Sequence, residues 1–304
     1  MSEPSELTKF KQNILSKSKV TQGVYVSNYK KLRELLQDED IASCSQKRVI
    51  DVVQDIDNRN SQQALINVAF LIRRYEEMGI NELDAYRKKN EVLIREKKFE
   101  TNEALAEKLP AYDTLVDYVD SLLKAKKYIQ YIINYLLLYY QVRNADLIFD
   151  FVVLKKDTKD KSKNYLWLNA RMKRVHYIRN VYKTAKIIKS NGKDAGYGQK
   201  AINITDPVFV GVMKLLAAEQ KKENKPIVFF PITDNIGYYI KKMTYENLGE
   251  TLIFKAVVNH FRDNVNMLKQ IEFNRGATIK VILDSYDVES EPINEGGAPH
   301  AQLR

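Results

Sequence analysis

Cysteine is nearly absent from this chain of 304 residues, and so is any long apolar run. A single residue, Cys44, excludes an internal disulfide framework and a cysteine-based zinc site, which favours a reducing compartment, the cytoplasm or the nucleus. The longest apolar candidate, residues 131–142, contains Asn134 and four tyrosines and falls short of the roughly 18 residues that a transmembrane helix needs. We find no signal peptide and no internal repeat. We therefore expect neither secretion nor a membrane partner.

The sequence also lacks a cluster of acidic residues of the kind that binds two metal ions, so we expect chemistry that uses no metal and no other cofactor. Basic residues are in excess instead. The 49 lysines and arginines outnumber the 39 aspartates and glutamates, which gives a net charge of +10. A polyanion, most commonly nucleic acid, is the expected partner of such a protein. The alternative is a generally basic surface that only keeps the protein soluble.

The chain is long enough for two domains, because single domains usually hold about 100–200 residues. Residues 1–108 show helical periodicity and predict a small all-α domain, whose first 20 residues are polar and loosely held. Residues 98–110 are polar and end in proline, and we interpret them as the linker. Serines placed to begin helices are Ser27, Ser45 and Ser61.

A fourth helix in this domain, from residue 82 to about 98, carries a ridge of basic side chains. Lysines and arginines on such a ridge would bind DNA phosphates and give affinity and register with little sequence information. The alternative is that the ridge is only a solvated helix face. The residues that we expect to contact DNA here are Arg87, Lys88, Lys89, Arg95 and Lys97.

Residues 109–304 begin with helices and continue with β-branched and aromatic segments, which predicts a mainly α fold with a small antiparallel β-sheet, an α+β domain. A helix that is apolar nearly all round, residues 127–142, ends in Arg143, and Asp146 follows three residues later. An arginine beside a core is costly unless an anion or a carboxylate meets it. Arg143 is therefore either an anion ligand or the partner of Asp146 in a structural ion pair.

Three segments are predicted as strands: residues 165–169, 175–182 and 201–205. A polar hairpin tip that begins at Lys183 and Thr184 lies between the last two. Lys186 and Lys189 in this tip are rivals of Lys183 as the lysine that reaches a phosphate, and Lys186 is also an expected DNA contact. After the hairpin, a helix is expected from residue 206, a short strand at residues 226–231, and helix again to residue 266.

The last patterned segment is a short helix containing Ile271 and Phe273, a break at Gly276, and a second apolar run that leads to Tyr286. The tyrosine stands ten residues beyond the glycine. Alone, it would be interpreted as one of 19 tyrosines that caps a terminal core helix.

The order of Arg143 with its following acid, a hairpin lysine and a tyrosine beyond a glycine resembles that of tyrosine recombinases, the phage-integrase family. The resemblance covers nearly the whole chain and implies an all-α core-binding domain, residues 1–108, followed by a catalytic domain, residues 109–304. It implies site-specific cleavage and rejoining of DNA through a covalent 3′-phosphotyrosine. Tyr286 would be the nucleophile, Arg143 a ligand of the phosphate and Lys183 the proton donor. Double-stranded DNA is then the partner, bound by a dimer or a tetramer.

Two positions depart from the family pattern. The family's His-x-x-Arg motif is expected near Thr251 and Phe254, and Ala277 stands in place of the histidine or tryptophan after the glycine. A site that cleaves DNA needs at least two fixed cations on the phosphate. We expect Lys255 and Arg275 to supply the missing charge.

The sequence predicts that Lys255 and Arg275 point into one cavity with Arg143, Lys183 and Tyr286, whereas Arg262 is a more peripheral DNA contact. Two alternatives to a recombinase stay open. The first is a DNA-binding or architectural protein with a degraded site, and the second is a basic structural protein of a virion or nucleoprotein particle. The lysine, asparagine and isoleucine content suggests an AT-rich genome, such as that of a virus or a mobile element.

Overall fold

The structure is a computed structural model that describes residues 5–185, 196–230 and 234–288. The described residues form two compact units, which divide between residues 101 and 102. The division falls inside the helix α5 (Asn81–Ala106), so most of the predicted linker is helical. Lys186 and Lys189 lie outside the described residues, and their predicted roles stay predictions.

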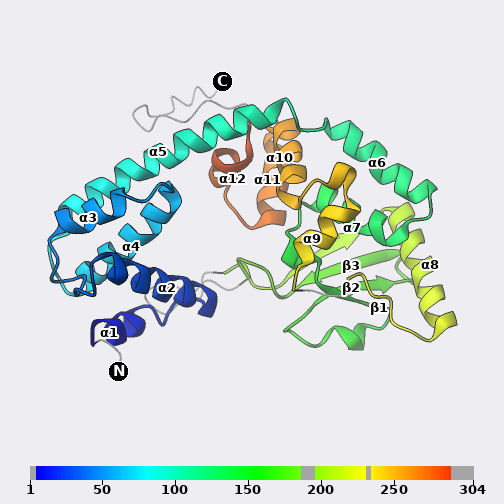
Figure 1. The fold of residues 1–304 in the computed structure, drawn as a ribbon. Helices are drawn as coiled ribbons and strands as arrows, with labels where there is room; N and C mark the ends of the chain where they lie inside the picture. The colour runs from blue at the N-terminus through cyan, green and yellow to red at the C-terminus, as the bar shows by residue number, and fades with distance from the viewer. Residues whose placement is uncertain (1–4, 186–195, 231–233, 289–304) are drawn as a thin grey trace, which may run out of the picture. The chain divides into compact units, whose positions relative to one another are not determined.

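The first unit is all α, as the sequence predicts. Its helices are α1 (Ser5–Asn13), α2 (Lys19–Leu35), α3 (Gln46–Gln54), α4 (Arg59–Tyr75) and the first part of α5. In the core α2 packs against α4 (Figure 1). The prediction of a loosely held N-terminus is wrong for α1, because Leu7 and Phe10 are buried. The Glu6 carboxylate also accepts a hydrogen bond from the Tyr29 hydroxyl at 2.9 Å.

Side-chain caps define the helix starts in this unit. Ser45 caps α3 as predicted. The prediction that Ser27 begins a helix is wrong, because α2 already begins after Ser18, whose side chain accepts the N–H of Thr21. The N–H of Ser61 donates to the side chain of Asn58, which is the actual cap of α4. An Asn and a Ser cap helices equally well, so the sequence pattern alone does not choose between them.

The second unit contains a four-stranded sheet in the order β1-β2-β3-β4 (Figure 1). The strands are β1 (Phe149–Val152), β2 (Asn164–Asn169), β3 (Arg174–Arg179) and β4 (Lys200–Ile204). β1 pairs with β2 in parallel and the other pairs are antiparallel. The sheet is therefore mixed rather than antiparallel as predicted. The three predicted strands are present, whereas the strand expected at residues 226–231 is absent from the described residues 226–230.

Seven α-helices accompany this sheet in the described part of the second unit. They are α6 (Tyr112–Lys124), α7 (Tyr128–Tyr140), α8 (Pro207–Glu223), α9 (Ile236–Met243), α10 (Glu250–Phe261), α11 (Val265–Arg275) and α12 (Ile279–Tyr286). The central helix is α7, which contacts α6, α8, α9 and α10 and is apolar nearly all round because its neighbours leave little of it exposed. None of the helices described is long and apolar enough to cross a membrane.

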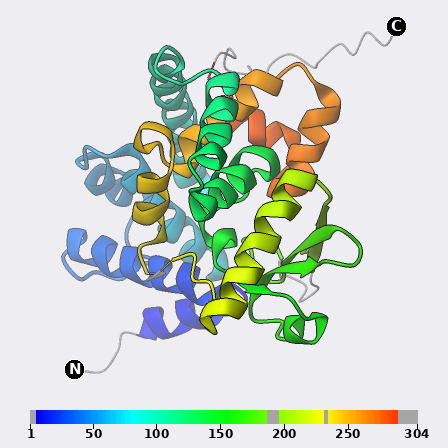
Figure 2. The same ribbon diagram turned by 90° about the vertical axis from the view of Figure 1, so that its right-hand side faces the viewer.

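The two faces of the sheet differ. α8 packs against β2 and β3 (Figure 2). Alternation along β3 places Val175, Tyr177 and Arg179 on the inner face, in the core, whereas His176 is only half-buried on the outer face. The inner face therefore presents Arg179 to the interior of the unit, where a charge needs a partner.

Candidate active site

A buried ion pair lies beside Arg143. α7 ends at Gln141, whose φ of 46° turns the chain out of the helix. The backbone N–H of Arg143 donates to the Asp146 carboxylate at 3.1 Å, and that carboxylate pairs with Arg179 at 3.3 Å. The side chains of Asp146 and Arg179 are 1% and 0% exposed. Asp146 therefore neutralises Arg179 and orients the backbone of Arg143, which leaves the Arg143 guanidinium for another anion.

A second buried cation stands next to Arg179. Lys200 on β4 is directly opposite Arg179 on β3, and both side chains are buried. The ammonium of Lys200 donates to the carbonyl of Phe273 and lies 4.7–5.2 Å from the ring centres of Tyr182, Tyr197 and Phe273. Burial lowers the pKa of Lys200, and the charges of Arg179 and Arg143 act in the same direction, so that the pKa is about 8. Like charges directly opposite on a sheet are destabilising, so this pair indicates that negative charge is needed nearby.

Arg275 reaches the same place from α11. Its side chain is buried, donates to the carbonyl of Gln141 at 3.1 Å and forms an ion pair with Glu250. Its guanidinium carbon lies 4.1 Å from the ring centre of Phe254. Phe254 stands where the family resemblance expects an arginine. The structure therefore places the Arg275 guanidinium over the side chain that occupies the expected arginine position.

Tyr286 is the last residue of α12 and faces these cations. Its ring packs edge-on against Phe254 at 4.5 Å and lies 5.7 Å from the guanidinium carbon of Arg275. Burial lowers the pKa of the Arg143 guanidinium, and the charge of Arg275 lowers it further, whereas Asp146, Tyr286 and Glu250 raise it. Arg143, Arg275 and Tyr286 therefore come within electrostatic range of one another although they lie far apart in the sequence.

We call Arg143, Arg179, Lys200 and Arg275 the cation cluster. Several of its N–H groups are buried and have no hydrogen-bond partner among the described residues: Nη1 of Arg143, Nε and Nη2 of Arg179, and Nε of Arg275. Buried donors are nearly always paired in folded proteins, by protein groups, water or a ligand. Two carboxylates, those of Asp146 and Glu250, accompany the four cations. The excess of positive charge and the unpaired donors together fit an anion.

Lys183 is exposed, and with Arg143 and Asp146 it lines a cavity of about 450 Å³. Its neighbour Thr184 packs closely against Gly276. A Cβ on that glycine would overlap the Thr184 hydroxyl. The hairpin that carries Lys183 is thereby held against the turn that precedes α12.

Lys255 contacts the segment that follows Tyr286 through Asn102. Lys255 is buried on α10, and its ammonium donates to the side chain of Asn102. Asn102 in turn donates to the carbonyl of Asp287 at 3.3 Å, and Arg262 pairs with the Asp287 carboxylate at 3.7 Å. Lys255 and Arg262 therefore fix the residue after Tyr286. The peripheral DNA contact expected of Arg262 stays a prediction.

The basic ridge on α5 is partly neutralised by its own helix. Arg87 pairs with Asp84 at 2.7 Å and with Glu91 at 3.1 Å, and Lys88 pairs with Asp84 at 2.8 Å. Pairs of this kind support the helix and reduce the charge available to a phosphate. The other predicted DNA contacts on the ridge, Lys89, Arg95 and Lys97, are exposed.

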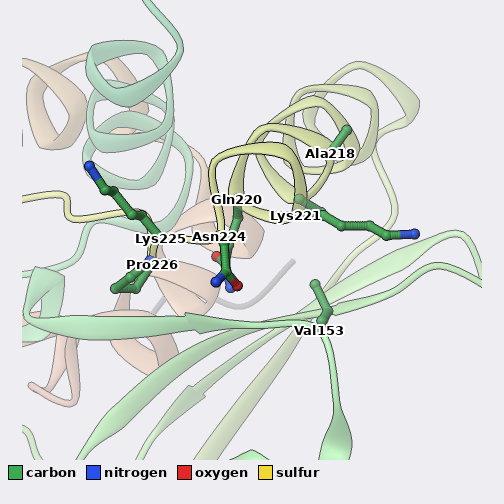
Figure 3. Close-up of a pocket in the computed structure, with 8 residues that line it drawn as sticks. Val153, Ala218, Gln220, Lys221, Asn224, Lys225 and Pro226 are labelled. Carbon is green, nitrogen blue, oxygen red and sulfur yellow. The ribbon is translucent and has the colours of Figure 1, made fainter.

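A larger cavity, of about 670 Å³, lies between the end of α8 and Val153. Its lining is mostly uncharged, and its two ammonium groups, those of Lys221 and Lys225, extend to opposite sides of it (Figure 3). No set of charged groups converges there. Size alone therefore does not make it the better candidate site.

Sequence reasoning missed Arg179, Lys200 and Glu250. The alternation of apolar residues along β3 places Arg179 on the same face as Val175 and Tyr177, and this pattern predicts a buried arginine. The same alternation along β4 places Lys200 on the face of Ile202 and Ile204. Glu250 carries no comparable signal, because it is brought to the site only by tertiary packing.

Comparison of the chain with protein-family models, with curated proteins and with solved structures returns no match.

Proposed function

We propose that this protein breaks and rejoins DNA strands, with Tyr286 as the nucleophile. The observation that carries the proposal is the meeting of Tyr286 with Arg143 and Arg275. Each arginine has one buried nitrogen, Nη1 of Arg143 and Nε of Arg275, without a partner among the described residues. A tyrosine beside two fixed guanidinium groups is suited to attack a phosphodiester, because the cations stabilise the charge that develops on the non-bridging oxygens. The resemblance to tyrosine recombinases supports the same function.

The proposed reaction exchanges one phosphoester bond for another. The phenolic oxygen of Tyr286 forms a bond to phosphorus while the bond from phosphorus to the 5′ oxygen breaks. The phenolic proton passes to solvent or a base, and the departing 5′ oxygen takes a proton from Lys183, which lines the cavity beside Arg143. Rejoining is the reverse of these steps, with a 5′ hydroxyl as the nucleophile, so no external energy source is needed.

The remaining residues have positioning roles in this proposal. Asp146 orients the backbone of Arg143, and the buried Lys200 joins β4 to the carbonyl of Phe273 on α11. Lys255 and Arg262 act through Asn102 and Asp287 on the end of α12. Each would affect the placement of Tyr286 or of a cation without touching the phosphate.

A second function, DNA binding without cleavage, is favoured by one contact. Glu250 pairs with Arg275 and lies within electrostatic range of Arg143. A carboxylate in this position reduces the positive charge that a phosphate meets. If the ion pair persists on DNA, the site binds a phosphate but stabilises its transition state poorly.

Trapping of a covalent adduct decides between the two functions. In nicked duplexes with a randomised central sequence, cleavage would release the short strand that carries the 5′ hydroxyl. Without that strand the protein cannot rejoin the DNA, so its covalent attachment becomes irreversible. Cleavage predicts a protein–DNA adduct that survives SDS and is absent in Tyr286→Phe. Tyr238→Phe is the matched control, because Tyr238 is 50% exposed on α9 and belongs to no part of the proposed machinery. DNA binding without any adduct would establish the second function instead.

A further inference from the structure

The connection between β1 and β2 and the turn between β2 and β3 carry a large part of the protein's positive charge. Residues 153–174 contain eight lysines and arginines and two aspartates, a net charge of +6, in a chain whose net charge is +10. Lys163 pairs with Asp150 at 3.0 Å. The other seven form no ion pair with any residue that the structure describes. This contrasts with α5, where acidic neighbours pair with two of the basic residues.

These residues lie on the outer face of the sheet. Tyr165 and Trp167 on β2 are directly opposite Ile178 and His176 on β3. The hydroxyl of Tyr165 donates to the carbonyl of Asp160, so the β1–β2 connection covers this face. Arg179, which belongs to the cation cluster, is on the other face. The basic connection and the candidate active site are therefore on opposite faces of one sheet.

A defined group of side chains lies at the centre of this basic surface. Trp167 and His176 stack at 4.4 Å, and the ammonium of Lys155 lies 6.0 Å from the centre of the Trp167 ring. Burial lowers the pKa of His176, whereas its side-chain hydrogen bond with Asn203 raises it. The charges of Arg174 and Lys155 lower this pKa further. Lys155 and Arg174 therefore flank a neutral imidazole that is stacked on the chain's single tryptophan.

Two polar atoms in this group lack partners. Nε of Arg174 and Nε2 of His176 are buried and have no hydrogen-bond partner among the described residues. In the same β1–β2 connection and β2–β3 turn, Lys156, Arg171 and Lys173 are exposed. Fixed polar atoms and exposed cations together suit a phosphate oxygen, because the former give geometry and the latter give attraction over a distance.

We infer that the outer face of the sheet, centred on Lys155, Arg174 and His176, binds the phosphate backbone of double-stranded DNA at a second site, separate from the reacting phosphate. The inference shares with the proposed function only its choice of DNA as the partner. Contacts of this kind carry little sequence information and add affinity. The protein then holds DNA on both faces of its sheet.

The salt dependence of DNA binding tests this site. Each phosphate contact that is removed lowers the slope of log K against log salt concentration by about 0.9. The Lys155→Ala/Arg174→Ala double variant should therefore reduce the slope by about 1.8, measured by fluorescence anisotropy on a duplex of arbitrary sequence between roughly 50 and 200 mM salt. The matched control is Lys214→Ala/Lys221→Ala, which removes two exposed lysines from α8.

Placing every variant in a Tyr286→Phe background excludes covalent attachment from the measurement. A smaller slope in the first double variant with an unchanged slope in the control supports the site. Equal slopes in the two double variants would overturn it. If Lys155→Ala/Arg174→Ala does not fold, Arg171→Ala/Lys173→Ala, in the exposed β2–β3 turn, makes the same test.

The result of the salt-dependence test is independent of the result of the adduct-trapping test at the active site. A reduced slope with no adduct in the wild-type protein would reject strand cleavage and keep the second DNA site. Adduct formation with equal slopes would do the opposite.

Discussion

Replacement of Gly276 by alanine tests how the hairpin is held against the turn before Tyr286. Gly276 has a φ of 64°, which is the left-handed region. That conformation costs a residue with a Cβ about 1–2 kcal/mol. A Cβ would also overlap the Thr184 hydroxyl and lie 3.4 Å from the Lys200 ammonium. The hairpin or the α11–α12 turn must then move.

The expected loss of stability has two parts. Overpacking in a closed site costs typically 1–3 kcal/mol, in addition to the backbone term, so Gly276→Ala should destabilise the second unit by about 2–5 kcal/mol. Trp167 is the only tryptophan of the chain and lies on β2. Its fluorescence during urea denaturation therefore reports on the unit that contains Gly276. The adduct yield should fall as well, because the movement displaces Lys183 and Arg275.

A second substitution separates the two parts. Thr184→Ala removes the overlapping hydroxyl, and the nearest remaining atoms, the Nζ of Lys200 at 3.4 Å and the Cβ of residue 184 at 3.6 Å, are at ordinary contact distances. Gly276→Ala/Thr184→Ala should therefore recover about 1–3 kcal/mol and keep only the backbone cost. Gly211→Ala is the control, because nothing lies within 4 Å of its Cβ in α8 and alanine should stabilise a helix by about 0.5–1 kcal/mol. A loss below about 1 kcal/mol for Gly276→Ala, or one that Thr184→Ala leaves unchanged, would refute this packing.

Three further predictions concern the cations. Arg143→Ala should slow adduct formation at least about 100-fold, because the charge that develops on the phosphate loses a preorganised donor. Lower single-turnover rates with unchanged DNA affinity would show this loss. A rate within about threefold of wild type would contradict the assigned role of Arg143. Lys183→Ala should slow cleavage of ordinary DNA but not of DNA with a 5′-bridging sulfur, since a thiolate leaves without a proton; a failure of the sulfur substrate to restore the rate would make Lys183 a phosphate ligand only. The lowered pKa of Lys200, about 8 against 10.5 for an exposed lysine, means that the unfolded chain binds more protons between these pH values, so this residue makes stability rise with pH there. Lys200→Met should remove that rise, and urea midpoints that change equally with pH in both proteins would argue against a buried Lys200.

Local signals predicted the elements whose start or end depends on one residue. Ser45 has the side chain that caps α3, and Gly276 has the backbone freedom that ends α11. The strands β2, β3 and β4 were likewise predicted, because their β-branched and aromatic residues alternate with polar ones. The helix α1 was missed, since its polar composition hides the three contacts that hold it, those of Glu6, Leu7 and Phe10.

Local signals do not predict the features that depend on residues far apart in the sequence. β1 pairs in parallel with β2 across an eleven-residue connection, and nothing in a four-residue strand specifies a partner. The site shows the same limit. Arg143 and Tyr286 were named from their order in the chain, whereas the partner of Lys255 proved to be Asn102, which is 153 residues away. Burial also explains this partner, because a lysine ammonium in a core donates to the nearest oxygen that geometry allows.

The charge balance at the site bears on whether it cleaves DNA or only binds it. With Lys200 protonated, the cation cluster has four positive charges, and Asp146 and Glu250 offset two of them, which leaves +2. A phosphodiester in its ground state carries one negative charge, whereas the phosphorus centre under attack by a phenolate carries two. In the proposed reaction, this charge would complement the transition state better than the bound DNA, which is the condition for catalysis rather than for binding. The ion pair with Glu250 uses Nη2 of Arg275 and leaves Nε unpaired, so Arg275 can hold the carboxylate and a phosphate oxygen together. For this reason the contact that favours a binding function is compatible with cleavage.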